Sequence, residues 1–418
     1  MELFRIAWRN VFRNRRRSVL NVVALTVGIS IMIIGLGWVG GYHTYIFGAL
    51  MDFQTGQAQV LNENYFQEAA RFPLDITVPD YPSLQEALVA HESIREAAGR
   101  VNFTLSLSNQ RASIRLAGTA IEPERERRVT VIDEYISDGD YLSDGAGVLI
   151  GRPIAERLEL AVGDLVFLTA TDSFGTQNFV DARLVGIFDF GYPEIDQNVL
   201  FMDMASAADF LRLDREVTRL AVRGSAGTAA PETLAAVRQV MHEVDADASR
   251  NVPLVAEPWE RFVQAAVTAV RADTFFFWLM LVIIFILIVV GIVNSMSMSV
   301  LERTGELGTL RALGMRRPAL IRLLVAEGLC LSGIAVLAAL LISTPIAVYL
   351  SSSGVDVSGM LPEEVPVPFG EAFYADFALW HYLVAIGVAA ATAVVGSAIP
   401  AWRAGRMNIV SAMYGERA

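Results

Sequence analysis

Residues 274–298 read TFFFWLMLVIIFILIVVGIVNSMSM and contain no charged side chain. A helix of about 20 predominantly apolar residues is long enough to cross the hydrocarbon core of a bilayer. This stretch therefore predicts a membrane-spanning helix. Three further apolar stretches meet the same length criterion, at residues 20–42, 321–350 and 377–399. The sequence predicts a membrane protein with four transmembrane α-helices.

The composition supports a membrane protein and excludes several classes of function. Of the 418 residues, 54% are hydrophobic and 19% are charged, which is too apolar for an ordinary soluble protein. The 33 basic residues are all arginine, so the chain itself supplies neither a P-loop lysine nor a Schiff-base lysine. A net charge of −12 argues against binding to nucleic acid.

The distribution of arginine predicts the orientation in the membrane. The short segments 1–19, 299–320 and 400–418 carry net charges of +5, +2 and +2, whereas residues 351–376 carry five acidic residues and no arginine. Because basic residues collect in cytoplasmic loops, both termini and the loop 299–320 are expected in the cytoplasm. Residues 43–273 and the short loop 351–376 are then periplasmic.

The segment 43–273 has the composition and the hydropathy pattern of a soluble α+β domain, and it carries 19 arginines and 35 acidic residues. Alternating apolar and polar residues predict strands, and amphipathic stretches predict helices. The expected strands are 101–108, 112–118, 164–170, 179–188 and 218–223, and the expected helices are 83–98, 153–160, 204–213 and 231–245. Residues 259–271 predict a stalk helix, either continuous with the second span or lying on the bilayer surface.

The cytoplasmic loop contains the stretch LERTGELGTLRALG at residues 301–314. Leu307, Leu310 and Leu313 recur every three residues and predict an apolar stripe. The charged residues beside it are Glu302, Arg303, Glu306 and Arg311. Glycines at 305, 308 and 314 would each cost about 1 kcal/mol inside a helix. Such a cost suits a helix pressed closely against another protein, and the alternative is an amphipathic helix resting on the inner leaflet.

The stretch LERTGELGTLRALGM at residues 301–315 is similar to the coupling-helix signature of FtsX-like permeases. These are membrane subunits of type VII ABC transporters and include MacB-like exporters and the LolC/LolE lipoprotein-releasing permeases. Residues 6–17 resemble the family's amphipathic helix before the first span. Residues 150–164, 184–188 and 400–409 resemble parts of its outer domain and C-terminal tail. The layout is closest to LolC/LolE, with residues 1–19 as a cytoplasmic amphipathic helix and 400–418 as a cytoplasmic tail.

The resemblance implies a mechanism called mechanotransmission. A separate ATPase dimer would bind ATP beneath two permease subunits, the second being another copy or a paralogue, and the periplasmic domains would move in response. The implied contacts to the ATPase are polar for Glu302, Arg303 and Glu306, and apolar for Leu307, Leu310 and Leu313. Arg311 and Gly314 complete this set. Because about 19 residues precede the first span, the ATPase is expected to be a partner chain.

The resemblance implies release of lipoproteins from the inner membrane as the most plausible activity. Two alternatives stay open: export of peptides or small toxic molecules with a periplasmic adaptor and an outer-membrane channel, and a scaffold that activates a cell-wall hydrolase. Membrane lipids are expected partners in each case. ATP would be used by the partner, and this chain is expected to need no cofactor.

Enzymatic motifs are not evident in the sequence. The four histidines lie far apart and show no HExxH spacing, and no G-x-S-x-G elbow is present. We therefore expect no catalytic, cofactor-binding or metal-binding residue. Cys330 falls within the third span and is expected to be a buried small apolar residue. Glu327 lies near the start of that span, where it either pairs with a nearby arginine or has a functional role.

Overall fold

A computed structural model describes residues 2–13, 15–143, 145, 147–213, 215–247, 252–355 and 373–406. The chain forms two compact units. The first takes its described residues from Met1–Tyr45, Thr268–Asp356 and Ala372–Ala418, and the second takes them from Ile46–Val267. The predicted loop around residues 356–372 and the tail after 406 lie outside the described residues.

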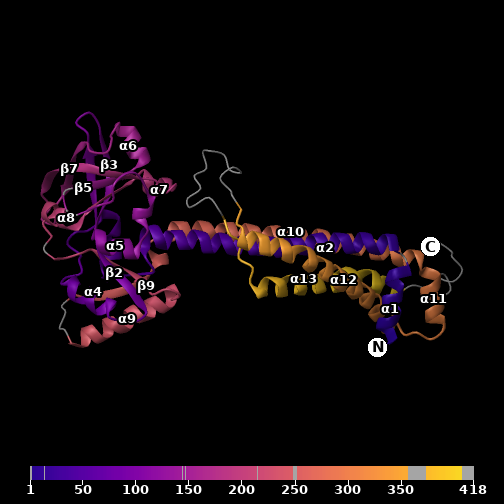
Figure 1. Ribbon diagram of the computed structural model, residues 1–418. Coiled ribbons are helices and arrows are strands. Elements are labelled where there is room, and N and C mark those ends of the chain that lie inside the picture. The colour runs from indigo at the N-terminus through magenta and orange to yellow at the C-terminus, as the bar shows by residue number, and fades with distance from the viewer. Residues whose placement is uncertain are drawn as a thin grey trace. The chain divides into compact units, whose positions relative to one another are not determined.

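The first unit is helical. Among the residues that the structure describes, four helices are long and apolar enough to span a membrane, as the sequence predicts, and Figure 1 shows their first-unit parts running side by side. They are α2 (Arg15–Leu50), α10 (Gln264–Glu302), α12 (Arg317–Ser352) and α13 (Leu379–Gly405). Two short helices, α1 (Glu2–Arg13) and α11 (Thr304–Ala312), lie at one end of this bundle.

Small residues bring α12 and α13 close together. Ala335 and Ala339 on α12 are buried, as are Ala385 and Ala389 on α13. The Ser332 hydroxyl donates a hydrogen bond of 3.1 Å across this contact to the carbonyl oxygen of Ala389. Membrane helices use such small residues because lipid gives no hydrophobic reason for helices to associate, so close backbone packing must provide it.

Large apolar residues remain exposed on the outside of the same helices. They include Phe275, Leu287, Leu341 and Leu383, each more than half exposed. In water such a surface would be a liability. On four helices of this length and hydropathy it is the surface that a bilayer covers.

The second unit is built on a ten-stranded mixed sheet. Its path is β10-β1-β9-β2-β3-β8-β5-β7-β4, with β6 pairing β2 and β7. The strands are β1 (Ala58–Asn62), β2 (Ile94–Ser108), β3 (Ser113–Ile121), β4 (Ile136–Gly139), β5 (Gly147–Gly151), β6 (Leu165–Thr171), β7 (Gln177–Phe188), β8 (Val199–Asp203), β9 (Arg219–Gly224) and β10 (Leu254–Pro258). The mixed α/β character agrees with the prediction.

Helices and short helical turns connect these strands. They are η1 (Met51–Thr55), α3 (Tyr65–Glu68), η2 (Ala69–Arg71), α4 (Tyr81–Val89), α5 (Pro123–Val129), η3 (Ile132–Tyr135), α6 (Arg152–Leu158), α7 (Pro193–Asp196), α8 (Met204–Leu211), α9 (Ala230–Asp247) and η4 (Trp259–Arg261). The Asp203 carboxylate caps α8 by accepting a hydrogen bond of 3.0 Å from the backbone N–H of Ser206.

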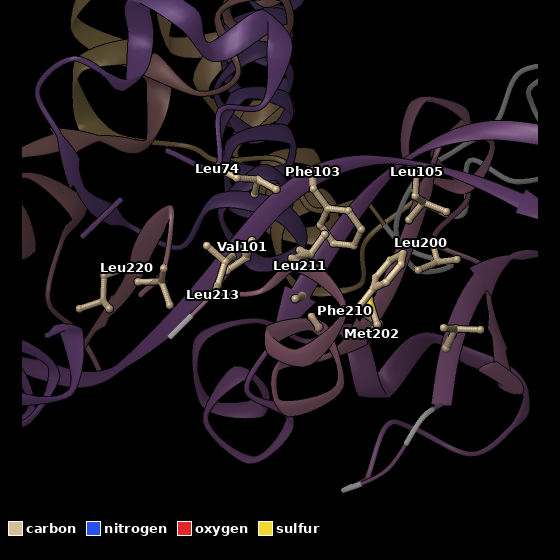
Figure 2. Close-up of a cluster of buried hydrophobic side chains, with 14 of the residues drawn as sticks. Leu74, Val101, Phe103, Leu105, Leu200, Met202, Phe210, Leu211, Leu213 and Leu220 are labelled. Carbon is tan, nitrogen blue, oxygen red and sulfur yellow. The ribbon is translucent and has the colours of Figure 1, made fainter. Parts of the chain in front are cut away.

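Alternation along the strands gives the sheet one main apolar face. Val101, Phe103 and Leu105 point to this face from β2, and Figure 2 shows Phe103 and Leu105 near Leu200 and Phe210. Their neighbours at even positions point the other way, because successive side chains of a strand lie on opposite faces. The second face is therefore available for a different purpose, which is described below.

One predicted helix is partly wrong. The expected helix at 83–98 ends as α4 at Val89, and β2 begins at Ile94. Pairing of β2 with β9 in the sheet overrides the helical periodicity that continues through Ala97 and Ala98. The predicted stalk begins with the short turn η4, after which α10 runs without a break from Gln264 to Glu302.

Candidate functional site

The predicted coupling stretch forms a separate short helix after the second span. The long helix α10 ends at Glu302, Arg303 leaves helical geometry with φ −108° and ψ 16°, and α11 begins at Thr304. At the other end, Gly314 has a φ of +99°, which favours glycine. The backbone N–H of Gly314 bonds to the Arg311 carbonyl, and that of Met315 bonds to the Leu310 carbonyl, each at 3.1 Å.

These two bonds form a Schellman motif, which satisfies carbonyl groups at a helix end. Leu310 and Met315 both pack against the same apolar cluster, the contact that accompanies this motif. The observed role of Gly314 is therefore to end α11 sharply before α12. This role needs no partner chain, so the predicted contact of Gly314 with an ATPase stays a prediction.

The leucine stripe is divided in the structure. Leu307 is 3% exposed and packs in a cluster with Leu320, Leu324 and Ala401, whereas Leu313 is 81% exposed. A three-residue spacing falls about 60° short of a full helical turn at each step, so Leu313 is turned about 120° from Leu307. Leu307 is buried within this unit and Leu310 is half-buried in the same cluster, so their predicted contacts with a groove of the ATPase stay predictions.

The exposed side of α11 has a different composition from the predicted stripe. Its members recur every three to four residues and mark one helix face. Within α11 and its C-cap they are Gly305, Glu306, Thr309, Ala312 and Leu313. The exposed last residue of α10, Glu302, lies just before them, and we call the whole set the outer face of α11. Small residues at the centre allow another backbone to approach closely, and carboxylates and Leu313 lie at its ends.

A polar network fastens the other side of this region to the bundle. Arg303 donates hydrogen bonds to both carboxylate oxygens of Glu327 at 3.3 Å and to Glu306 at 3.2 Å. Asn10 donates a bond of 2.5 Å to Glu327, and Arg13 pairs with Glu306. The network therefore joins α1, the start of α11 and α12, and its members line a cleft of about 240 Å³.

The network decides one question that the sequence leaves open. Glu327 is buried and pairs with an arginine, as one of the two alternatives predicts. Arg303 turns inward to make this pair, with 16% of its side chain exposed. Its predicted polar contact with an ATPase remains a prediction.

Electrostatics reinforce the pair between α1 and α11. The hydrogen bond from the Arg13 guanidinium lowers the pKa of the Glu306 carboxyl below its usual value, and the same bond raises the pKa of Arg13. Arg311 adds a third attachment, because its guanidinium donates a bond of 3.1 Å to the carbonyl oxygen of Gly405 at the end of α13.

Sequence reasoning missed Asn10 and Arg13 as members of this site. The available signal was the excess of arginine before the first span, which indicates orientation but not a partner. The helix α11 presents one small-residue face outward and is tied by side chains to α1, α12 and α13. Any displacement of α11 is therefore opposed by, or passed to, three other helices of the same unit.

Comparison with known families matches two regions of the chain. Residues 18–240 match the MacB-like periplasmic core domain, and residues 278–409 match the FtsX-like permease C-terminal region. The first match alone covers more than half of the 418 residues.

Curated relatives are similar along most of the chain. The lipoprotein-releasing system transmembrane protein LolC of Xylella fastidiosa is 22% identical over 421 residues, covering 95% of this chain and 93% of the relative. The LolC protein of Neisseria meningitidis is 22% identical over 319 residues, covering 74% and 72%. The periplasmic region of MacB from Actinobacillus actinomycetemcomitans aligns at 11% identity with a TM-score of 0.38, covering 53% of this chain and 97% of that one.

Proposed function

The chain belongs to the family of permeases with a MacB-like periplasmic core domain and an FtsX-like C-terminal region, and from this premise we propose that it transmits the movement of a partner ATPase to its periplasmic unit. It is an ABC transporter permease of the bacterial inner membrane, related to LolC and LolE. The observation that carries the proposal is the two-sided construction of α11, with an outer face of small residues and an inner side tied to three helices.

The outer face of α11 is the proposed contact for the ATPase. Gly305, Thr309 and Ala312 leave room for close approach, while Leu313 and Glu302 offer an apolar and a charged anchor at its ends. Leu307 and Leu310 support this face from beneath by packing on α12 and α13. Arg303 and Glu306 connect it to Glu327 and Arg13, so that a push on α11 reaches α1 and α12.

The proposed contact is tested by two variants of matched chemistry. Leu313→Asp places a charge on the outer face, and Phe174→Asp makes the same kind of change at an exposed apolar residue of the second unit. We expect Leu313→Asp to remove co-purification of the ATPase and ATP hydrolysis by the complex, at unchanged membrane insertion, whereas Phe174→Asp leaves both intact. Full ATPase binding by Leu313→Asp would disprove the contact.

The orientation is part of the same proposal, with both termini and α11 in the cytoplasm. Cys330 is buried, so a newly introduced cysteine can be labelled above a low background. A membrane-impermeant maleimide added to intact spheroplasts should label Thr176→Cys in the second unit. It should label Thr309→Cys only after the membrane has been permeabilised. The reverse pattern would overturn the orientation.

The proposed activity is the release of lipoproteins from the inner membrane. It is supported by relatives named as lipoprotein-releasing proteins that align along most of the chain. An acyl anchor holds a lipoprotein in the bilayer by about 0.8 kcal/mol per buried CH₂ group, so release requires work from outside the bilayer. Depletion of the chain should retain lipoproteins in the inner membrane. Unchanged sorting would reject this substrate while leaving the coupling proposal standing.

A further inference from the structure

The ten-stranded sheet of the second unit has a cavity of about 380 Å³ on the face opposite its main apolar core. Residues of four neighbouring strands line its floor, and each lies on the face opposite the main core, because its neighbours in sequence belong to that core. These floor residues are Arg100 and Asn102 on β2, Ala117 and Thr119 on β3, Val199 and Phe201 on β8, and Arg219 on β9.

Aromatic side chains form the rest of the wall. Except for Phe201 of β8, they come from short turns that cover the sheet, namely η1, α3 and the residues that follow η2 and η4. The aromatic lining residues are Phe53, Tyr65, Phe66, Phe72, Phe201 and Phe262. The rings of Phe66 and Phe262 are 5.3 Å apart, and the Arg261 guanidinium lies 4.5 Å above Phe66. An apolar wall with a few polar groups is typical of sites for small molecules.

All the charged residues that line the cavity are basic. Three arginines line the cavity, and none of its described lining residues is acidic. Two of these arginines already form ion pairs with carboxylates that do not line the cavity: Arg100 pairs with Glu126, and Arg261 pairs with Glu257. The third, Arg219, bonds to neutral groups: its Nε donates 3.0 Å to the Asn102 amide oxygen, and its Nη1 lies 3.5 Å from the Gln59 amide oxygen.

Arg219 therefore contributes a positive charge that no described carboxylate balances. Its guanidinium carbon lies 5.6 Å from the Tyr65 ring and 5.5 Å from the Phe262 ring. Burial lowers the pKa of Arg219, which is the direction expected for a cation that lacks a counter-charge.

The hydroxyl of Tyr65 is a second polar group of this wall that a ligand could satisfy. Tyr65 is 2% exposed, and within the described part of the chain its hydroxyl makes no well-formed hydrogen bond, although it lies beside Arg219. Arginine can only donate, so the hydroxyl hydrogen still lacks an acceptor. A buried polar group without a partner costs free energy, and a bound anion would remove that cost.

From this geometry we propose that the cavity binds a single-chain anionic amphiphile, with its carboxylate or phosphate head at Arg219 and Tyr65 and its apolar chain against the phenylalanines. The guanidinium and the phenol both donate, which suits an anionic acceptor. The aromatic wall accepts an alkyl or aryl body. This inference stands apart from the proposed function, because binding is measured without an ATPase.

The test uses the full chain in lipid nanodiscs and equilibrium dialysis with radiolabelled probes, with empty nanodiscs subtracted. The probes are octanoate and octyl phosphate, neutral 1-octanol, and inorganic phosphate as a head group alone. We expect saturable binding of one probe per chain for at least one of the two anions, and the preferred anion identifies the head. Octanol and inorganic phosphate should bind at least about tenfold more weakly. Equal binding of octanol or of inorganic phosphate would overturn the proposal.

Three variants locate the binding. Arg219→Gln should weaken it by at least about tenfold, and Tyr65→Phe by about tenfold, which is the size expected for a lost hydrogen bond to a charged group. Arg223→Gln is the matched control on the same strand, since Arg223 pairs with Asp52 and does not line the cavity; it should stay within about twofold. Tyr65→Phe keeps the ring, so it tests the site even if Arg219→Gln fails to fold. Unchanged binding by Tyr65→Phe and Arg219→Gln would place the ligand elsewhere and reject the site.

Discussion

The polar network beside α11 and the cavity on the sheet of the second unit both contain arginine side chains, but they differ in what faces the charge. In the network, Arg303 meets Glu327 and Glu306, and Arg13 meets Glu306. In the cavity, Arg219 meets amide oxygens and aromatic rings. A network with balanced charges has its donors and acceptors occupied, whereas an unbalanced arginine retains donors for a ligand.

The difference separates two uses of the same residue type. Balanced ion pairs in a partly buried site fix the relative positions of helices, because removing one member leaves the other charge uncompensated. This suits the region around α11, where the proposed function requires movement to pass between helices. An unbalanced arginine costs stability in the empty protein and is expected where binding restores the balance. Substitutions that remove one charge at a time test this division.

The largest effect is expected at a balanced pair that joins strand β2 to helix α5. Arg100 pairs with Glu126, both are buried, and the Thr130 hydroxyl adds a bond of 2.8 Å to Glu126. Glu126→Gln keeps the shape of the side chain and removes its charge, leaving Arg100 uncompensated. We expect a loss of about 3–5 kcal/mol in local free energy of unfolding. Hydrogen–deuterium exchange of β2 in the full chain measures it.

Glu124→Gln is the control for this change, since Glu124 lies on the same helix, α5, but is exposed. It should alter exchange by less than about 0.5 kcal/mol. A loss below about 1 kcal/mol in Glu126→Gln would show that a buried arginine here tolerates the absence of its carboxylate. Arg219 would then no longer be exceptional, and the comparison would fail.

The next largest effect is expected at the centre of the network. Glu327→Gln removes the negative charge that faces Arg303 and one of the two acceptor oxygens that Arg303 and Asn10 share. We expect α11 and α12 to lose about 2–4 kcal/mol of local stability, because Arg303 keeps Glu306 as a second partner. A double-mutant cycle with Arg303→Gln should give a coupling energy of about 1–3 kcal/mol. Additive single effects would mean that the two residues do not act as a pair.

The sequence predicts the parts of this molecule that depend on local pattern. The four spans follow from apolar length alone, and the stretch at 301–315 stands out through its glycines and charges. Helix geometry even explains where the stripe prediction fails, since the drift of a three-residue repeat carries Leu313 away from Leu307. That drift follows from the three-residue spacing itself and needs no tertiary contact.

The sequence does not predict the parts that depend on distant pairing. Asn10 and Glu327 are separated by 317 positions, and their contact requires the bundle to be assembled first. Arg219 looks like an ordinary arginine at the start of a strand until the strand order places it beside Asn102 and beneath Tyr65. Charge balance at a site is a property of the fold, which composition cannot reveal.

A smaller effect of opposite sign is expected at the cavity. Tyr65→Phe removes a buried hydroxyl without a well-formed bond while keeping the ring that packs beside Phe66. The empty protein should therefore be unchanged or more stable by up to about 1 kcal/mol, measured by exchange at β1 and β9. A loss of more than about 1 kcal/mol would show that the hydroxyl already has a structural partner, and the cavity would no longer differ from the network.

The smallest effect is expected at the exposed edge of the network. About half of the Glu306 side chain and of its partner Arg13 are exposed, so solvent and salt weaken the pair, and Glu306→Gln should cost about 0.5 kcal/mol or less at pH 7. Because Arg13 lowers the pKa of Glu306 in the folded chain, the pair stabilises the fold above the unfolded pKa of about 4.3 and loses this contribution as the pH falls through the lower folded value.

Thermal midpoints of the wild type and Glu306→Gln should therefore differ slightly at pH 7, and the difference should disappear below pH 4 and in high salt. A difference in thermal midpoint that persists at acid pH would come from the shape of the side chain rather than from its charge. A loss of several kcal/mol of stability at pH 7 would mean that Glu306 contributes as much to folding as Glu327. Under the proposed coupling role, the same variant should reduce ATP hydrolysis by the complex far more than it reduces stability. Glu306 would then join the balanced network to the outer face of α11, where its charge matters for movement rather than for folding.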